Sequence, residues 1–292
     1  MAPGSHGRVG DHVHRRGHGL LQRQGAREGC VTSPRLLFSD KLRALGIPHA
    51  FTTRQGGAST GPFASLNLGR GVEDNPRTVA ANLAAVLRVL GLDPARHVEA
   101  DQVHGSVVAV VGARDGGRSV PEADGLASMD GGTVLAVHAA DCVPLLFADP
   151  RLGTVAAVHA GWKGVASGIP VEAVRVLGGR FGSRPQELVV AIGPSIGPCH
   201  YEVDKPVMDR MRRWPWWTDV APVNAQGRWQ LDLRAACVRQ LIGAGVPRGR
   251  IDVLDLCTYD YPELFYSFRR DRITGRMAAI IAVPPTPTGG NG

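Results

Sequence analysis

The segment 134–164 constrains the fold of this chain more than any other stretch. It reads as three apolar strands, and the last two, residues 143–148 and 154–158, flank a turn with the sequence DPRLG. A proline near the start of such a turn and a glycine at its end are typical of a tight reversal of the chain. The sequence therefore predicts a β-hairpin in the middle of the chain.

Cys142 and His159 lie where two of these apolar segments end. Facing residues of the hairpin have numbers that sum to about 302, which puts the two side chains within one register step, at roughly 5–8 Å between Cβ atoms. That separation suits a shared metal ion or a thiolate–imidazole pair, and two packed core residues are the plain alternative. Small residues in the sequence AGWKG follow His159, and glycines beside a strand let a ligand approach the backbone. We therefore treat the pair as a candidate site.

Elsewhere the hydrophobic pattern alternates between the period of strands and that of helices. The clearest helix is expected at 78–90, with Asn75 as its cap, Pro76 in its first turn and Gly91 at its end. Strands outnumber helices and several are joined by short turns, so we predict an α+β fold in which mixed β-sheets pack as a sandwich with flanking helices. The other expected elements are helices at 169–177 and 233–244 and strands at 50–53, 106–111, 188–192, 251–254 and 277–283.

One domain is expected over residues 34–283, because no linker interrupts them. Residues 1–33 are rich in glycine, arginine and histidine and read as a disordered extension, and residues 284–292 read as a flexible tail. The chain has a net charge of +7, but five arginines against two acidic residues within residues 1–30 account for +3 of it. The remaining charge is spread without a basic block, so we expect no nucleic-acid partner.

Five cysteines, an odd number without regular spacing or a secretory signal, argue against a disulfide framework and for reduced thiols in the cytoplasm. Since no apolar stretch reaches the length of a membrane span, we expect no membrane association. The neighbours Cys199 and His200 would point to opposite faces of an extended segment, which favours structural roles for both.

His104 precedes a glycine at a strand boundary and is the natural third partner of Cys142 and His159. Two histidines and a cysteinate leave a tetrahedral Zn²⁺ one open position, and gaps of 38 and 17 residues differ from the close pairs of a zinc finger. Such a zinc ion lowers the pKa of bound water to about 7. Asp141, beside Cys142, is expected to carry protons or to orient a ligand. Arg54, in a glycine-rich loop, is either an anion-binding group or a surface arginine.

Five motifs, in order, also resemble those of the YfiH family, known as laccase-domain or multicopper polyphenol oxidase proteins. The resemblance covers about residues 36–283 and implies a sandwich-like α+β fold with His104, Cys142 and His159 as zinc ligands. It also implies purine nucleoside phosphorylase activity, with adenosine deaminase and methylthioadenosine phosphorylase activity. The motifs are DQVHG at 101–105, ADCVP at 140–144, HAGWKG at 159–164, GPSIGPCHYEV at 193–203 and FYSFRRDRITGRM at 265–277.

The leading hypothesis is thus a zinc-dependent purine nucleoside phosphorylase that converts adenosine, inosine or guanosine and phosphate to base and ribose 1-phosphate. Deamination fits an open zinc site directly, with water attacking C6 of adenine and Asp141 carrying protons. Phosphorolysis needs a group that holds phosphate, for which Arg54 is the first candidate and Arg270 the second.

Three other functions stay open. One is a metal-free cysteine hydrolase that edits peptidoglycan precursors, with Cys142 as nucleophile and His159 as base. Another is a polyphenol oxidase with a single Cu²⁺ in the same set of two histidines and one cysteine. A third is a non-catalytic metal-binding protein. A full multicopper laccase is excluded, because only six histidines lie outside residues 1–30.

Overall fold

The structure, a computed structural model, describes residues 33–285. Two six-stranded sheets and a two-stranded ribbon form its β-structure. The first sheet has the order β1 (Leu36–Leu37), β2 (His49–Thr52), β14 (Met277–Ala282), β7 (Val134–Ala139), β3 (His97–Ala100) and β5 (Ser119–Val120). The second has the order β13 (Ile251–Val253), β10 (Val189–Ile192), β8 (Val143–Asp149), β9 (Thr154–Ala160), β6 (Gly125–Ser128) and β4 (Val108–Val110). The ribbon pairs β11 (Glu202–Val203) with β12 (Trp229–Gln230).

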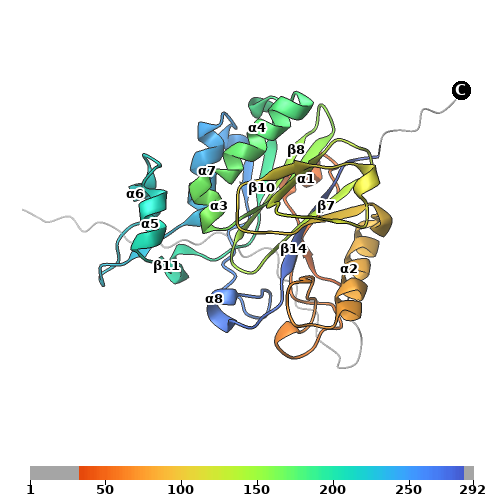
Figure 1. Cartoon of the computed structure of the whole chain (residues 1–292), viewed down its shortest axis with the longest axis horizontal. Helices are drawn as coiled ribbons and strands as arrows, with labels where there is room; N and C mark the ends of the chain where they lie inside the picture. The colour runs from red at the N-terminus through yellow and green to blue at the C-terminus, as the bar shows by residue number, and fades with distance from the viewer. Residues whose placement is uncertain (1–32, 286–292) are drawn as a thin grey trace, which may run out of the picture. The chain divides into compact units, whose positions relative to one another are not determined.

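Helices cover the outer faces of the two sheets (Figure 1). Helix α2 packs on the first sheet, and α3, α4 and α7 pack on the second. The helices described are α1 (Asp40–Ala44), α2 (Pro76–Leu90), α3 (Trp162–Ser167), α4 (Ile169–Phe181), α5 (Lys205–Met211), α6 (Trp217–Val220), α7 (Leu233–Gly243) and α8 (Phe268–Asp271).

The core between the sheets is built from the alternate side chains that each strand turns inward. Leu135 of β7 and Ile281 of β14 meet Leu146 of β8 and Val155 of β9 there, all of them fully buried. Neighbouring residues such as Leu145 point to the opposite face and pack against the helices. Both faces of the central strands are therefore buried, which is why they read as continuous apolar runs. The predicted α+β fold, a sandwich of mixed sheets with flanking helices, is confirmed.

The predicted hairpin is formed by β8 and β9. Val143 pairs with Ala160 and Leu145 with Val158, one residue from the register expected from the sequence. The turn Asp149–Gly153 is closed by the Asp149 carbonyl, which accepts a 2.9 Å hydrogen bond from the Gly153 amide. The register difference makes Cys142 and His159 diagonal neighbours rather than directly facing ones, a separation that still lets both side chains reach one point.

Helix α2 begins and ends where its sequence signals lie. The Asn75 side chain accepts hydrogen bonds from the backbone amides of Arg77 and Thr78, at 2.9 and 3.3 Å. Gly91 ends the helix with φ +66°, a conformation that glycine adopts at low cost. The helices expected at 169–177 and 233–244 are also present, as α4 and α7. No helix within residues 33–285 is long and apolar enough to cross a membrane.

The expectations about the two chain ends lie mostly outside the described residues. The predicted extension, residues 1–33, lies outside the described residues except for its last one, and so does most of the tail 284–292. The single catalytic domain predicted over 34–283 stays a prediction.

Strand β3, with the sequence HVEA, was not expected as a strand, because half of its short run is polar. Its polar side chains are nevertheless buried.

Replacing Asn75 by alanine is expected to lower the free energy of unfolding by about 1 kcal/mol, because two amides of the first helical turn lose their acceptor. Equilibrium unfolding in urea measures the change. Asn75→Asp retains an acceptor and serves as the control, with stability within a few tenths of a kcal/mol of the parent. Equal losses in both variants would contradict the capping role.

Candidate metal centre

Three side chains that are far apart in the sequence meet at one end of the sandwich. His104 lies in the loop between β3 of the first sheet and β4 of the second, and Cys142 lies between β7 of the first and β8 of the second. His159 is on β9. One ligating atom from each lies within 4.8 Å of the other two. The structure therefore brings together all three residues predicted as metal ligands.

The backbone at this point is shaped to let the three side chains approach. His104 has φ +59° and Asp141, next to Cys142, has φ +96°, both uncommon for residues other than glycine. A Cβ atom on Gly161 would lie 2.8 Å from Cδ2 of His104 and 3.2 Å from Sγ of Cys142. Glycine after the β9 histidine thus makes room for the ligating side chains themselves.

Asp124, just before β6, fixes the orientation of two of the three groups. Its Oδ1 lies 2.9 Å from Nδ1 of His159 and accepts a 2.9 Å hydrogen bond from the amide of His104. Its Oδ2 accepts from the amides of Val103 and Gly105. Because Nδ1 of His159 is engaged, Nε2 is the nitrogen left to bind a metal, the arrangement typical of histidine ligands.

Asp124 was given no role by the sequence analysis. The signal that could have identified it is the requirement that a ligating histidine has a carboxylate or carbonyl behind it. Asp124 begins a segment that pairs with the strand of His159, and Gly125 is placed opposite Val158.

The electrostatics of the site favour a thiolate beside an imidazolium. Burial raises the pKa of the Cys142 thiol, but the charge of His159 and hydrogen bonds from both histidines outweigh burial and bring it to about 6. Burial lowers the pKa of His159, but the Cys142 thiolate and Asp124 outweigh it and raise it to about 9. At neutral pH the metal-free site therefore holds a deprotonated thiol, the form that binds metals and attacks electrophiles.

Asp141 lies beside the site, but its carboxylate is already engaged. Oδ1 accepts a 2.6 Å hydrogen bond from the Thr258 hydroxyl, and Oδ2 accepts one of 2.6 Å from the Arg269 amide. Asp141 thus ties the segments of Thr258 and Arg269 to the loop of Cys142. Its expected part in proton transfer stays a prediction.

Arg54 and Arg270 are not among the residues that line the cavity at this site. The Arg54 guanidinium donates to the carbonyls of Ala64 and Pro262, at 2.9 and 3.0 Å, and lies over the Tyr266 ring. That of Arg270 donates to carbonyls of the segment 258–265 and to Asp271. These contacts tie both arginines to the neighbouring backbone, and their expected part in binding phosphate stays a prediction.

A cavity of about 590 Å³ opens over the three ligands, a size typical of small-molecule sites. Its aromatic part is formed by Trp162, Tyr201 and Phe268. Its charged part contains four arginines, none of them assigned from the sequence. These are Arg70, Arg269, Arg272 and Arg276.

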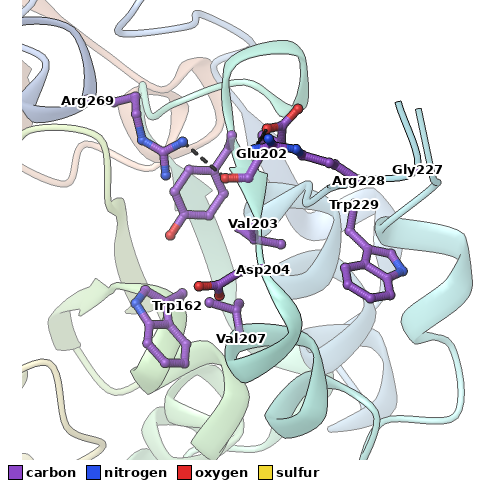
Figure 2. Close-up of a pocket in the computed structure, with 10 residues that line it drawn as sticks. Trp162, Glu202, Val203, Asp204, Val207, Gly227, Arg228, Trp229 and Arg269 are labelled. Carbon is purple, nitrogen blue, oxygen red and sulfur yellow. Dashed lines mark hydrogen bonds and ion pairs between the residues drawn. The ribbon is translucent and has the colours of Figure 1, made fainter. Parts of the chain in front are cut away.

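A second cavity, of about 490 Å³, adjoins the first and shares Trp162, Tyr201 and Arg269 with it. Figure 2 shows Arg269 at the upper left and Trp162 at the lower left, with Asp204 next to Trp162. Arg269 donates to the Glu202 carbonyl at 3.0 Å. Arg228 pairs with the Glu202 carboxylate at 2.7 Å, so one ion pair and one charged hydrogen bond hold Glu202 in the wall of this cavity.

Glu99 supplies a buried carboxylate to the larger cavity. Its Oε1 pairs with Arg70 at 3.0 Å, while Oε2 is buried without a hydrogen-bond partner. Burial is the main reason that the pKa of Glu99 is raised. His97 and His138 lie near it. Burial and then the charge of Arg70 lower the pKa of His97 to about 4. Burial and then the charge of His97 lower the pKa of His138 to about 3. An unsatisfied buried acceptor in a cavity wall is suited to a ligand hydrogen-bond donor.

Comparison with known proteins finds a matching family, similar sequences and similar structures. The family described as multi-copper polyphenol oxidoreductase laccase matches residues 48–284. Purine nucleoside phosphorylase YlmD of Geobacillus stearothermophilus is 41% identical over 81% of this chain and 90% of its own length. The Bacillus subtilis protein of the same name is 39% identical, over 80% and 87%. The crystal structure of the hypothetical protein YfiH of Bacillus licheniformis superposes with a TM-score of 0.82 at 35% identity, covering 88% of this chain and 98% of that one.

In metal-free protein, alkylation of Cys142 by iodoacetamide is expected to accelerate with rising pH through a midpoint near 6, because the thiolate is the nucleophile. Peptide mass spectrometry measures the rate. Cys199, whose pKa is raised by burial and by nearby acidic groups, gives an internal reference that reacts only at higher pH. Asp124→Asn should move the Cys142 midpoint upward, since the imidazolium loses its partner. A midpoint near the ordinary value of 9 in the parent would contradict the thiolate–imidazolium pair.

The buried histidine His97 should make stability fall as pH falls. Its pKa is 6.5 in the unfolded chain and about 4 in the folded one, so between these values only the unfolded state takes up the proton. His97→Gln is therefore expected to flatten the dependence of unfolding free energy on pH between 6.5 and 4, by up to about 3 kcal/mol. Urea unfolding at several pH values tests this, and parallel curves for parent and variant would refute it.

Proposed function

The chain belongs to the multi-copper polyphenol oxidoreductase laccase family, and on this premise we propose that it is a zinc-dependent purine nucleoside phosphorylase. The relatives reported above carry that name and support an enzyme of this general kind. The observation that carries the proposal is the convergence of His104, Cys142 and His159 on the floor of a nucleoside-sized cavity.

The donor set fits a zinc ion. Two imidazoles and a thiolate are borderline-soft ligands of the kind that zinc prefers, and three protein ligands leave one position for water or substrate. Asp124 provides the carboxylate behind His159 that such sites require. His104 is exposed to the cavity, whereas His159 is 2% exposed, so the open side of the site faces the substrate. When bound, the ion supplies a Lewis acid next to the substrate.

The four arginines of the cavity support a phosphate subsite. Arg276 is the strongest candidate, because it is half-buried and its side chain is held by hydrogen bonds from Nη1 to the carbonyls of Thr274 and Gly275. A fixed guanidinium binds phosphate oxygens in a defined geometry. In phosphorolysis one of those oxygens forms a bond to C1′ of the ribose while the bond from C1′ to N9 of the purine breaks. The base leaves with the electron pair and takes up a proton.

The aromatic and acidic parts of the cavity suit the nucleoside. Trp162, Tyr201 and Phe268 provide surfaces on which a purine ring can stack. The free oxygen of Glu99 is an acceptor for a ribose hydroxyl or for a purine N–H group. The carboxylates of Glu99, Asp101 and Asp141 line this cavity. Glu99 has a buried oxygen without a hydrogen-bond partner, whereas both oxygens of Asp141 are bound.

Adenosine deamination is a second activity that the same site supports. It requires water at the open side of the metal centre and a group that moves protons, for which Asp141 is the candidate from the sequence. Methylthioadenosine is proposed as a further substrate of phosphorolysis, on the resemblance of the sequence motifs.

The test is phosphate-dependent release of hypoxanthine and ribose 1-phosphate from inosine by purified metal-replete protein. His104→Ala and Cys142→Ala are expected to lose the metal and to reduce kcat/KM about 100-fold or more. Arg276→Met should raise KM for phosphate about 10-fold while retaining the metal. Cys237→Ala, on the buried face of α7, is the matched control and should keep metal and activity.

Other outcomes identify the other functions. Ammonia released from adenosine without phosphate would indicate deamination alone. A metal-free protein that is inactivated by alkylation of Cys142 would indicate a cysteine hydrolase, and polyphenol oxidation only with Cu²⁺ would indicate a single-copper oxidase. Metal binding without any of these reactions would refute the enzymatic proposal.

A further inference from the structure

A second cluster of metal-ligating side chains lies away from the centre described above. One atom each of Cys199, Cys257 and Asp260 lies within 4.8 Å of the other two. None of the three lines either of the cavities described above. Cys199 belongs to the short 3-10 helix η5 (Pro198–His200), and Cys257 and Asp260 lie between β13 and α8.

Backbone contacts hold the two segments of this cluster together. Ser195 and Cys257 form an isolated parallel β-bridge, and the Thr258 amide donates to the Ser195 carbonyl at 3.1 Å. The Gly197 amide donates to Sγ of Cys257 at 3.2 Å. A Cβ on Gly197 would lie 3.3 Å from that sulfur and 3.5 Å from Sγ of Cys199, so glycine leaves both sulfurs unobstructed. The two thiols are therefore brought together by secondary structure rather than by chance side-chain rotation.

His200 supports the carboxylate of the cluster from behind. Its Nε2 lies 2.6 Å from Oδ1 of Asp260, and its ring stacks on Tyr259 with centroids 4.1 Å apart. This contact engages Oδ1 of Asp260 and fixes the orientation of the carboxylate. A ligand carboxylate held by a hydrogen bond from an oriented partner is typical of metal sites.

We propose that Cys199, Cys257 and Asp260 bind a second zinc ion, with water as the fourth ligand. Two thiolates and a carboxylate form a zinc-type donor set, and the exposure of Cys199 and Asp260 leaves the fourth position open to solvent. In tetrahedral coordination two zinc-bound sulfurs lie about 3.8 Å apart, so small rotations of these side chains close the site.

Two thiolates and a carboxylate whose ligating atoms lie within 4.8 Å of one another repel each other when all three are charged. A divalent cation would relieve that repulsion and deprotonate both thiols.

The ion would act on the structure of the cavity wall rather than on the reaction. It would join η5 to the segment that contains Thr258, whose hydroxyl binds Asp141 next to Cys142. Arg270 already binds the carbonyls of Thr258 and Tyr259, so this segment is fixed from its other side. The second ion thus has a structural role, and the occupancy of its site does not depend on the proposed phosphorylase activity.

Zinc content per chain, measured by mass spectrometry of the metal after zinc loading and dialysis, tests the proposal on the full-length protein. The background is Cys142→Ala, which removes a ligand of the first centre. This variant is expected to retain one equivalent of zinc, and Cys142→Ala/Cys199→Ser to lose it. Cys199 is exposed, so its replacement leaves the core intact. Cys142→Ala/Cys237→Ala, with the same number of thiols, should keep the ion.

Cobalt and thermal unfolding give readouts independent of activity. Co²⁺ bound to Cys142→Ala should show a sulfur-to-cobalt charge-transfer band that weakens at least twofold when Cys199 is replaced. Added zinc should raise the Tm of Cys142→Ala but not that of Cys142→Ala/Cys199→Ser. Asp260→Asn in the same background should weaken zinc affinity about 10-fold or more.

Three results would overturn the proposal. They are a Cys142→Ala protein without zinc, zinc retained in Cys142→Ala/Cys199→Ser, and a Cys199–Cys257 disulfide that forms under air in place of metal binding. Failure of the first centre is distinguishable, because wild type and Cys142→Ala would then contain equal zinc while Cys199→Ser would still lose it.

Discussion

The carboxylate of Asp124 is the group on which the geometry of the metal centre depends. It receives the imidazole of His159 and three consecutive backbone amides of the loop that contains His104. The main chain of Asp124 adds a further link, since its carbonyl accepts a 2.7 Å hydrogen bond from the His159 amide. Without this acceptor, a buried ring nitrogen and several amides would lose their partner at once, which is costly in a site with so little water. One carboxylate therefore positions two of the three ligands.

Short-range signals explain why much of the fold was predictable. The turn at 149–153 and the apolar runs beside it define the β8–β9 hairpin, and with it the proximity of Cys142 and His159. The caps of α2 lie within three residues of the helix ends they define. These features depend on neighbours in the sequence, so a single sequence is enough to identify them.

Long-range pairing explains what sequence reasoning missed. Asp124 reaches His159 because β6 pairs with β9, and no local pattern reports that pairing. Arg54 was interpreted either as an anion-binding group or as a surface arginine, and no local pattern reports that its guanidinium donates to the carbonyl of Pro262, 208 residues away. The arginines of the cavity come from α8 and from loops, whose positions depend on the whole sandwich. The hydrogen-bond partner of a side chain can thus lie far away in the sequence, where local patterns give no sign of it.

The loops of His104 and Cys142 are also the places where the chain passes from one sheet to the other. An ion held by both loops and by β9 would therefore cross-link the two sheets at this end of the sandwich. The same three side chains would then serve both the reaction and the stability of the sandwich. Changes in the surrounding loops would leave such an ion in place, whereas its loss would loosen the contact between the two sheets. Such coupling restrains the three ligands more tightly than catalysis alone would.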